Sequence, residues 1–250
     1  DTQRPTHLCF DSLGRAYADK YFPPEAKRRA VEMFENLRAA FREELREADW
    51  LEAETKDNAL RKLEALSARI GYPNHWVEQG QRVTISRNTF LANARSLIIE
   101  NRRADLARIG HTADREKWSV TVPTVNGGYE WQSNALHLPA GILQPPFFML
   151  NADGAVNYGA IGAFAGHEIG HAFDDRGARY DASGTLSNWW TDRDRKQFES
   201  RAQCVVDQRH RPRHDLERIG MNIEPALIGD MKQAQQTDRI SLKDFRTFDI

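Results

Sequence analysis

Two series of apolar residues recur at helical spacing in the first third of the chain. The first series consists of Val31, Phe34, Leu37, Phe41 and Leu45, and the second of Leu60, Leu63, Leu66 and Ile70. Residues three or four positions apart share one face of an α-helix, so each series predicts a helix with a buried face. A third helix is predicted over residues 88–109, with Gly110 as its stop.

The pattern changes to strand and turn over residues 118–143. Val120 and Val122 alternate with polar residues, as in a half-buried strand, and Pro123 indicates an edge because proline cannot donate to a sheet ladder. An edge strand can pair with an extended peptide. Helices resume near Asn151 or Asp153, either of which is a candidate N-cap. We therefore expect a predominantly α chain with a small β-sheet, an α+β fold.

The second helical region carries a group of residues suited to metal chemistry. His167 and His171 are four residues apart, so on a helix both imidazoles can reach one Zn²⁺. Glu168 follows the first histidine and can act as general base toward a zinc-bound water. The pattern His-Glu-x-x-His would occur by chance in such a chain with odds of about one in a hundred, and these residues would then simply lie on a solvated helix face. The helical spacing of the surrounding apolar residues favours the metal site.

Longer segments resemble the neprilysin family of zinc metallopeptidases, which are gluzincins. They are residues 138–148 (LPAGILQPPFF), 157–162 (NYGAIG), 166–175 (GHEIGHAFDD) and 188–191 (NWWT). The resemblance implies a thermolysin-like zincin core preceded by helices. It divides the chain into a helical region (1–117), a catalytic core with edge strand and metal helix (118–208) and a divergent tail (209–250).

The resemblance also implies roles for individual residues. His167 and His171 would hold one zinc ion, and Glu168 would be the catalytic base. Asn126 and Gly127 occupy the place of an Asn-Ala pair that hydrogen-bonds the substrate backbone in the family, with Gly127 replacing the alanine. Read without the resemblance, Asn126-Gly127 is an ordinary hairpin turn.

Four further residues are substrate-binding or supporting candidates by resemblance. Ile142 and Phe147 would line the pocket for the residue after the scissile bond, although both are equally consistent with core packing. Asp174 or Asp175 would orient a ligand imidazole, and either is also a plausible turn residue. Trp189-Trp190 is expected to fill a core wall.

The third zinc ligand is the point at which the resemblance weakens. The family takes it from a glutamate in a Gly-Glu-Asn-Ile-Ala-Asp helix, and no intact copy of that motif is present. Local similarity leaves Glu224 as the nearest carboxylate, whereas the spacing from the histidines indicates Asp230. Without a third protein ligand the site would bind zinc weakly. The family's C-terminal segment with its transition-state-stabilising histidine is also not recognised, so we expect a fragment or a divergent, truncated homologue.

The expected function is that of a zinc metalloendopeptidase acting on oligopeptides on the amino side of large apolar residues. The alternative is a catalytically impaired remnant that binds peptides or serves as a structural part of a longer protein. A net charge of −1 gives no reason to expect nucleic acid as a partner, and no run of 18 apolar residues predicts a transmembrane segment. The resemblance implies an extracytoplasmic location.

Overall fold

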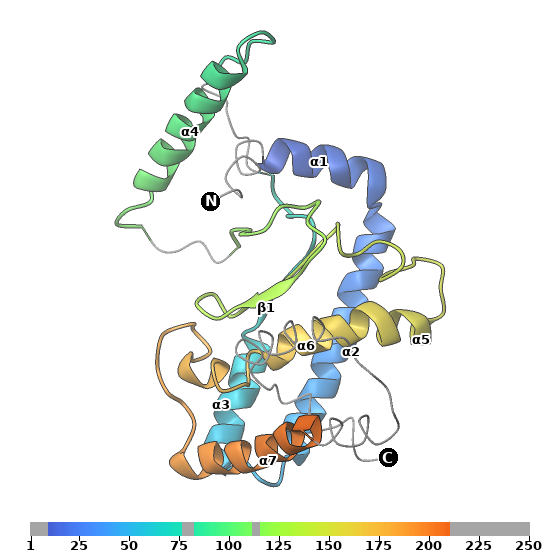
Figure 1. Ribbon diagram of the computed structural model, residues 1–250, viewed down its shortest axis with the longest axis vertical. Coiled ribbons are helices and arrows are strands. Elements are labelled where there is room, and N and C mark those ends of the chain that lie inside the picture. The colour runs from blue at the N-terminus through green and yellow to red at the C-terminus, as the bar shows by residue number, and fades with distance from the viewer. Residues whose placement is uncertain (1–9, 77–82, 112–115, 211–250) are drawn as a thin grey trace. The chain divides into compact units, whose positions relative to one another are not determined.

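The computed structural model describes residues 10–76, 83–111 and 116–210. Its helices are α1 (Phe10–Tyr21), α2 (Pro24–Glu47), α3 (Ala53–Glu64), α4 (Phe90–Leu106), α5 (Gly154–Asn157), α6 (Ala163–Gly170) and α7 (Asp192–His210), as Figure 1 shows. A π-helical turn spans Tyr158–Gly162 and a 3-10 turn spans Gly177–Arg179. The strands are β1 (Ser67–Gly71), β2 (Gly128–Glu130) and β3 (Ala135–Pro139). The predicted fold class, mostly helical with a small sheet, is confirmed.

The chain forms two compact units, each built from separate stretches of sequence. The first contains Asp1–Asn36, Ser67–Gly128 and Ala135–Ala165, and the second contains Leu37–Leu66, Tyr129–Asn134 and Gly166–Ile250. Three of the boundaries therefore fall within elements, namely α2, β2 and α6. Among the described helices, none is long and apolar enough to cross a membrane.

The first predicted helix is confirmed as α2. Pro24 opens it, Glu25 lies in its first turn and Arg46 in its last, an arrangement that suits both the fixed φ of proline and the helix dipole. Phe34 and Leu45 of the predicted apolar face are buried, whereas Val31 is 38% exposed. The spacing thus located the helix correctly and its buried face in part.

The second series is helical only in its first half. Helix α3 ends at Glu64, and Ile70 lies in β1 rather than on a continuing helix. Ile70 is still buried, but as a strand residue whose Cα pairs with Leu138 of β3. Spacing alone could not separate these two outcomes, because the strand is selected by a partner some 70 residues further along the chain.

The sheet has the strand order β1-β3-β2. Strands β1 and β3 run parallel, with Ser67 opposite Ala135 and Gly71 opposite Pro139. All five residues of β3 are buried, as expected for a strand covered on both faces. Gly71 ends β1 with φ +75°, and a Cβ there would lie 2.6 Å from the Phe22 ring, so both backbone conformation and space require glycine.

The predicted edge strand at Val120 and Val122 is wrong. This segment forms turns, and β2 begins only at Gly128. Val122 is nevertheless fully buried, and its carbonyl accepts a 2.9 Å hydrogen bond from the Gly141 N–H. The apolar alternation therefore identified the buried Val122, whereas Val120 is only partly buried, and a loop rather than a strand supplies both positions. The predicted helix over 88–109 is confirmed as the shorter α4, and Gly110 beyond it has φ +85°.

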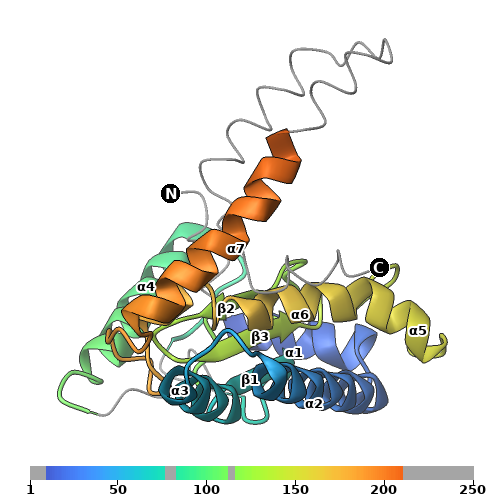
Figure 2. The same ribbon diagram turned by 90° about the horizontal axis from the view of Figure 1, so that it is seen from below.

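The second unit is organised around α3, α7 and the C-terminal part of α6. The buried Asp194 carboxylate of α7 accepts hydrogen bonds of 3.1 and 3.3 Å from the Glu52 N–H at the start of α3. In Figure 2, α7 begins near α3 and then runs away from it. Trp190 packs with Ala178 and Phe198, and Trp189 packs against this cluster. The expectation that the tryptophan pair fills a core wall is confirmed.

Candidate metal centre

The metal motif lies on a helical run that begins where the sequence indicated. Asp153 is the N-cap, and its carboxylate accepts a 2.8 Å hydrogen bond from the Ala155 N–H. Between α5 and α6 the helix widens into the π-helical turn Tyr158–Gly162. Such turns are frequent near functional sites because they shift the phase of the residues that follow. The sequence pattern did not predict this turn.

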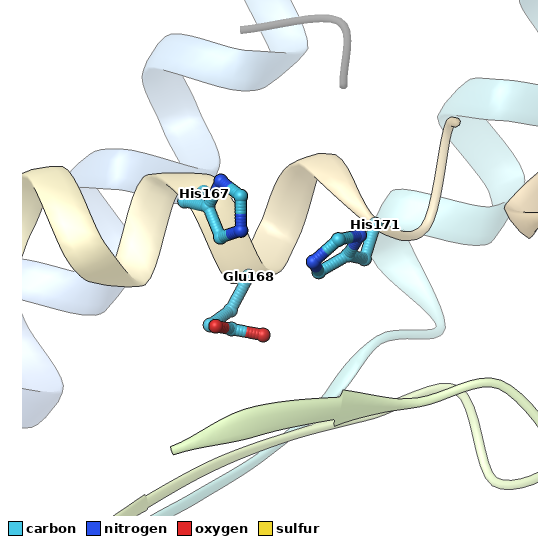
Figure 3. Close-up of side chains that lie close together, drawn as sticks. All are labelled: His167, Glu168 and His171. Carbon is cyan, nitrogen blue, oxygen red and sulfur yellow. The ribbon is translucent and has the colours of Figure 1, made fainter. Parts of the chain in front are cut away.

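His167, Glu168 and His171 form the one group of potential metal ligands found among the described residues. One ligand atom from each residue lies within 4.8 Å of the other two. The imidazole centroids are 4.6 Å apart with an interplanar angle of 79°. Figure 3 shows His167 and His171 on successive turns, with the Glu168 carboxyl group alongside. Imidazole nitrogens are donors that zinc prefers, so His167 and His171 fit the implied ion, with the Glu168 carboxylate beside them.

Burial distinguishes the members of this group. Glu168 is 7% exposed, while both histidines are partly exposed. A carboxylate next to two partly exposed imidazoles is placed to accept a proton from a reactant bound at those imidazoles. The group can therefore combine metal binding with general base chemistry.

Asp174 contacts the second histidine directly. Its Oδ2 lies 2.7 Å from Nδ1 of His171, and its Oδ1 accepts hydrogen bonds from the N–H groups of Arg176 (2.9 Å) and Gly177 (2.6 Å). A carboxylate acceptor favours the His171 tautomer with its proton on Nδ1, which places the ring's lone pair on Nε2. The sequence left Asp174 and Asp175 as alternatives. In the structure it is Asp174 that contacts the His171 ring.

Trp131 also contacts His171, and sequence reasoning missed it. Its indole N–H donates to the His171 carbonyl oxygen at 3.2 Å, and the Arg176 guanidinium lies 3.9 Å from the centre of the indole ring. Trp131 precedes His171 by 40 residues. The local sequence does not predict this contact, because it depends on the tertiary arrangement of Trp131 and the metal helix.

The predicted substrate-binding residues belong to the first unit, whereas the metal group belongs to the second. Asn126 Oδ1 accepts a 2.9 Å hydrogen bond from its neighbour Gly127 N–H. Neither residue forms the turn between β2 and β3, which is made by residues 131–134 and contains Asn134 at φ 47°. The hairpin-turn alternative for this pair is therefore wrong.

The two candidate pocket residues differ sharply in exposure. Ile142 is 4% exposed and belongs to the core, whereas the Phe147 side chain is 43% exposed. Phe147 is thus the member of the pair that a ligand can reach in this structure. The two candidates for the third zinc ligand, Glu224 and Asp230, lie outside the described residues.

Comparison with known proteins identifies a family to which this chain is similar. Two models, both described as peptidase family M13, match residues 6–73 and 126–243. The chain is 37% identical over 198 residues to a putative zinc metalloproteinase of Streptococcus gordonii, covering 79% of this chain and 35% of that protein. It is 33% identical over 242 residues to the neutral endopeptidase of Lactobacillus helveticus, covering 94% of this chain and 37% of that protein.

A solved structure agrees with the fold. The zinc metalloprotease ZMP1 of Mycobacterium tuberculosis in its open state superimposes with a TM-score of 0.75 at 41% sequence identity, covering 82% of this chain and 32% of that one. This chain therefore spans about a third of the length of the curated relatives it matches.

Proposed function

Because this chain belongs to peptidase family M13, we propose that it carries the zinc-binding helix of an endopeptidase that hydrolyses oligopeptides. The observation that supports this most strongly is the group His167, Glu168 and His171, with Asp174 hydrogen-bonded to His171. Its donor chemistry suits zinc, and its helical spacing brings the donors together. Family membership supports the proposed reaction, and the geometry supports the proposed roles of these residues.

Each member of the group has a distinct role in the proposal. His167 and His171 bind the ion, and Asp174 holds His171 in the tautomer that a metal ligand requires. When bound, zinc supplies a Lewis acid that polarises the scissile carbonyl and lowers the pKa of water. The Glu168 carboxylate takes a proton from the attacking water and passes it to the leaving amine.

We also propose roles in substrate binding for four residues. Asn126 and Gly127 would pair with the peptide backbone, and Ile142 and Phe147 would contact the large apolar residue that follows the scissile bond. The exposed Phe147 ring supports this role more directly than the buried Ile142. Two peptides that differ only in leucine or aspartate after the scissile bond test the preference, and equal kcat/KM values would contradict it.

The third zinc ligand comes, in this proposal, from Glu224 or Asp230. Catalytic zinc sites hold three protein ligands and leave one position for water or substrate. Family membership also leads us to propose an extracytoplasmic location, which cell fractionation would test.

Zinc content separates the peptidase from the impaired remnant. We expect one zinc per chain, bound tightly in the purified protein and lost in His167→Ala, with peptide hydrolysis that a chelator abolishes. Weak or absent zinc binding in the wild-type protein would contradict the proposal and favour a remnant that keeps the fold without the chemistry.

A further inference from the structure

Helix α3 carries a buried lysine that the proposed chemistry does not use. Lys62 is 1% exposed and is one of the buried residues of α3. Lysine is almost never fully buried unless its amino group has partners, because desolvating it is costly. Burial lowers the pKa of Lys62 to about 7, while Asp174 and Asp181 act in the opposite direction.

The Lys62 amino group binds the backbone of a single turn. It donates to the carbonyl oxygens of Gly177 at 2.7 Å and Tyr180 at 2.5 Å, which bracket the 3-10 turn. Both the ammonium form and the neutral amine have enough N–H groups for these two bonds. The Trp189 indole N–H donates to the same Gly177 oxygen at 3.1 Å. Lys62 thus holds this turn from within the core, whatever its charge.

The same turn positions the carboxylate that contacts the metal helix. The Gly177 N–H donates to Asp174 Oδ1, and Asp174 Oδ2 contacts Nδ1 of His171. Gly177 is therefore bound on both sides, through its carbonyl to Lys62 and through its N–H to Asp174. The Lys62 amino group is thus connected to the His171 imidazole through three hydrogen bonds, by way of Gly177 and Asp174.

Close packing would pass a shift of this turn on to the metal helix. A Cβ added to Gly177 would collide with the backbone carbonyls of His171 and Ala172, so the turn already packs directly on the end of the metal helix. Lys62 itself is held in place, because Asn134 donates to its carbonyl oxygen at 3.0 Å and Tyr129 donates to Asn134 at 2.7 Å. The buried lysine is thus part of a rigid support.

We propose that Lys62 is a positioning residue of the metal centre. It fixes the turn at Gly177–Arg179 so that Asp174 keeps His171 in the orientation and tautomer needed to bind zinc. This inference rests on the proposed zinc site. Supporting groups of this kind typically change metal affinity about 10-fold to 100-fold when they are removed.

The test compares Lys62→Met with Lys56→Met in the purified protein. Lys56 is on the same helix and also donates to a backbone carbonyl, that of Arg46 at 2.9 Å, and within the described residues this bond does not lead to the metal helix. We expect Lys62→Met to lower zinc affinity about tenfold. The visible spectrum of the Co²⁺-substituted protein, which reports ligand geometry where d¹⁰ zinc is silent, should also change. Lys56→Met should match the wild type in both measurements.

A double-mutant cycle tests the route through Asp174. If Lys62 acts through this carboxylate, Lys62→Met combined with Asp174→Asn should bind zinc no more weakly than Asp174→Asn alone. Additive losses would overturn the route. Wild-type zinc affinity and Co²⁺ spectrum in Lys62→Met, with only a lower melting temperature, would overturn the positioning role and leave a purely structural lysine.

Three further outcomes have distinct meanings. If Lys62→Met does not fold, Trp189→Phe removes the other donor to the Gly177 oxygen and should weaken zinc binding about threefold, with unchanged affinity contradicting the inference. If the wild-type protein binds no zinc, the zinc site fails, and this inference fails with it. Zinc binding in the wild type with no effect of Lys62→Met would overturn this inference alone.

Discussion

At His171 one hydrogen bond decides which ring nitrogen can face a metal ion. Asp174 Oδ2 lies 2.7 Å from Nδ1, which leaves Nε2 as the ligand nitrogen. The sequence supplied both acidic candidates after the metal helix but no means of choosing between them. The choice follows from the backbone, because the N–H groups of Arg176 and Gly177 point at Asp174 Oδ1.

Replacing Glu168 by glutamine separates catalysis from metal binding. The amide has nearly the same shape but cannot accept a proton from water, so we expect kcat for peptide hydrolysis to fall by about 10²-fold to 10⁴-fold. Zinc content should stay at the wild-type value because both histidines remain. Turnover and metal analysis on the same preparation check this. Unchanged turnover would rule out Glu168 as the general base.

Lys62 should make the free energy of unfolding of the metal-free protein increase with pH in the alkaline range. Its folded-state pKa is about 7, whereas an unfolded lysine titrates near pH 10.4, so between these values the unfolded chain binds more protons. The free energy of unfolding then rises with pH across this window, by at most about 1.4 kcal/mol per unit. Below about pH 7 both states hold the proton, and the full cost of burying the charge remains.

Denaturant unfolding of the wild type and Lys62→Met at several pH values checks this sign. The wild type should gain stability relative to the variant as the pH rises from 7 to about 10. If the free energies of unfolding of the two proteins changed with pH in parallel, Lys62 would not have the lowered folded-state pKa.

The elements of the site differ in how far the sequence specified them. The metal helix was predicted from its apolar spacing and its candidate caps Asn151 and Asp153, since these are local features, and the structure uses Asp153. The π-helical turn just before α6 was not, because it depends on the packing of one particular stretch. In the segment that leads into β2, the sequence indicated only that a glycine replaces the family's alanine. The structure shows a physical reason for that glycine.

Gly127→Ala should destabilise the first unit. A Cβ at this position would lie 2.6 Å from the His137 carbonyl oxygen and 2.8 Å from the Phe164 ring, so the backbone or the ring must move. We expect a loss of about 1–3 kcal/mol, as for other overpacked sites. Gly128→Ala is the matched control, because its added Cβ meets nothing within 4 Å. Equal melting temperatures for the two variants would contradict the predicted clash.

At the scale of the whole molecule, the central question is what completes the zinc site. The described residues supply two histidines and a buried glutamate, and the chain spans about a third of the relatives it matches. The division into regions 1–117, 118–208 and 209–250 stays a prediction. In the proposal above, the third ligand comes from the last of these regions.

Alanine substitutions at Glu224 and Asp230 test that dependence. We expect one of the two to weaken zinc binding strongly, because removing one of three protein ligands opens the site, while the other variant behaves as wild type. Competition with a chelator of known affinity measures the effect. If neither substitution alters zinc binding, the protein site consists of the two histidines alone.

The sequence by itself determined the metal helix, its paired histidines and glutamate, the family, and the mostly helical fold. These follow from periodicity and from short motifs, which are local properties of the chain. The tertiary structure alone decided that Ile70 is a strand residue, that Asp174 contacts His171, and that Lys62 holds the Gly177 turn. The strand pairing and the Lys62 bond join residues far apart in sequence, and the choice of Asp174 depends on the exact path of the backbone after the helix. No spacing rule encodes either.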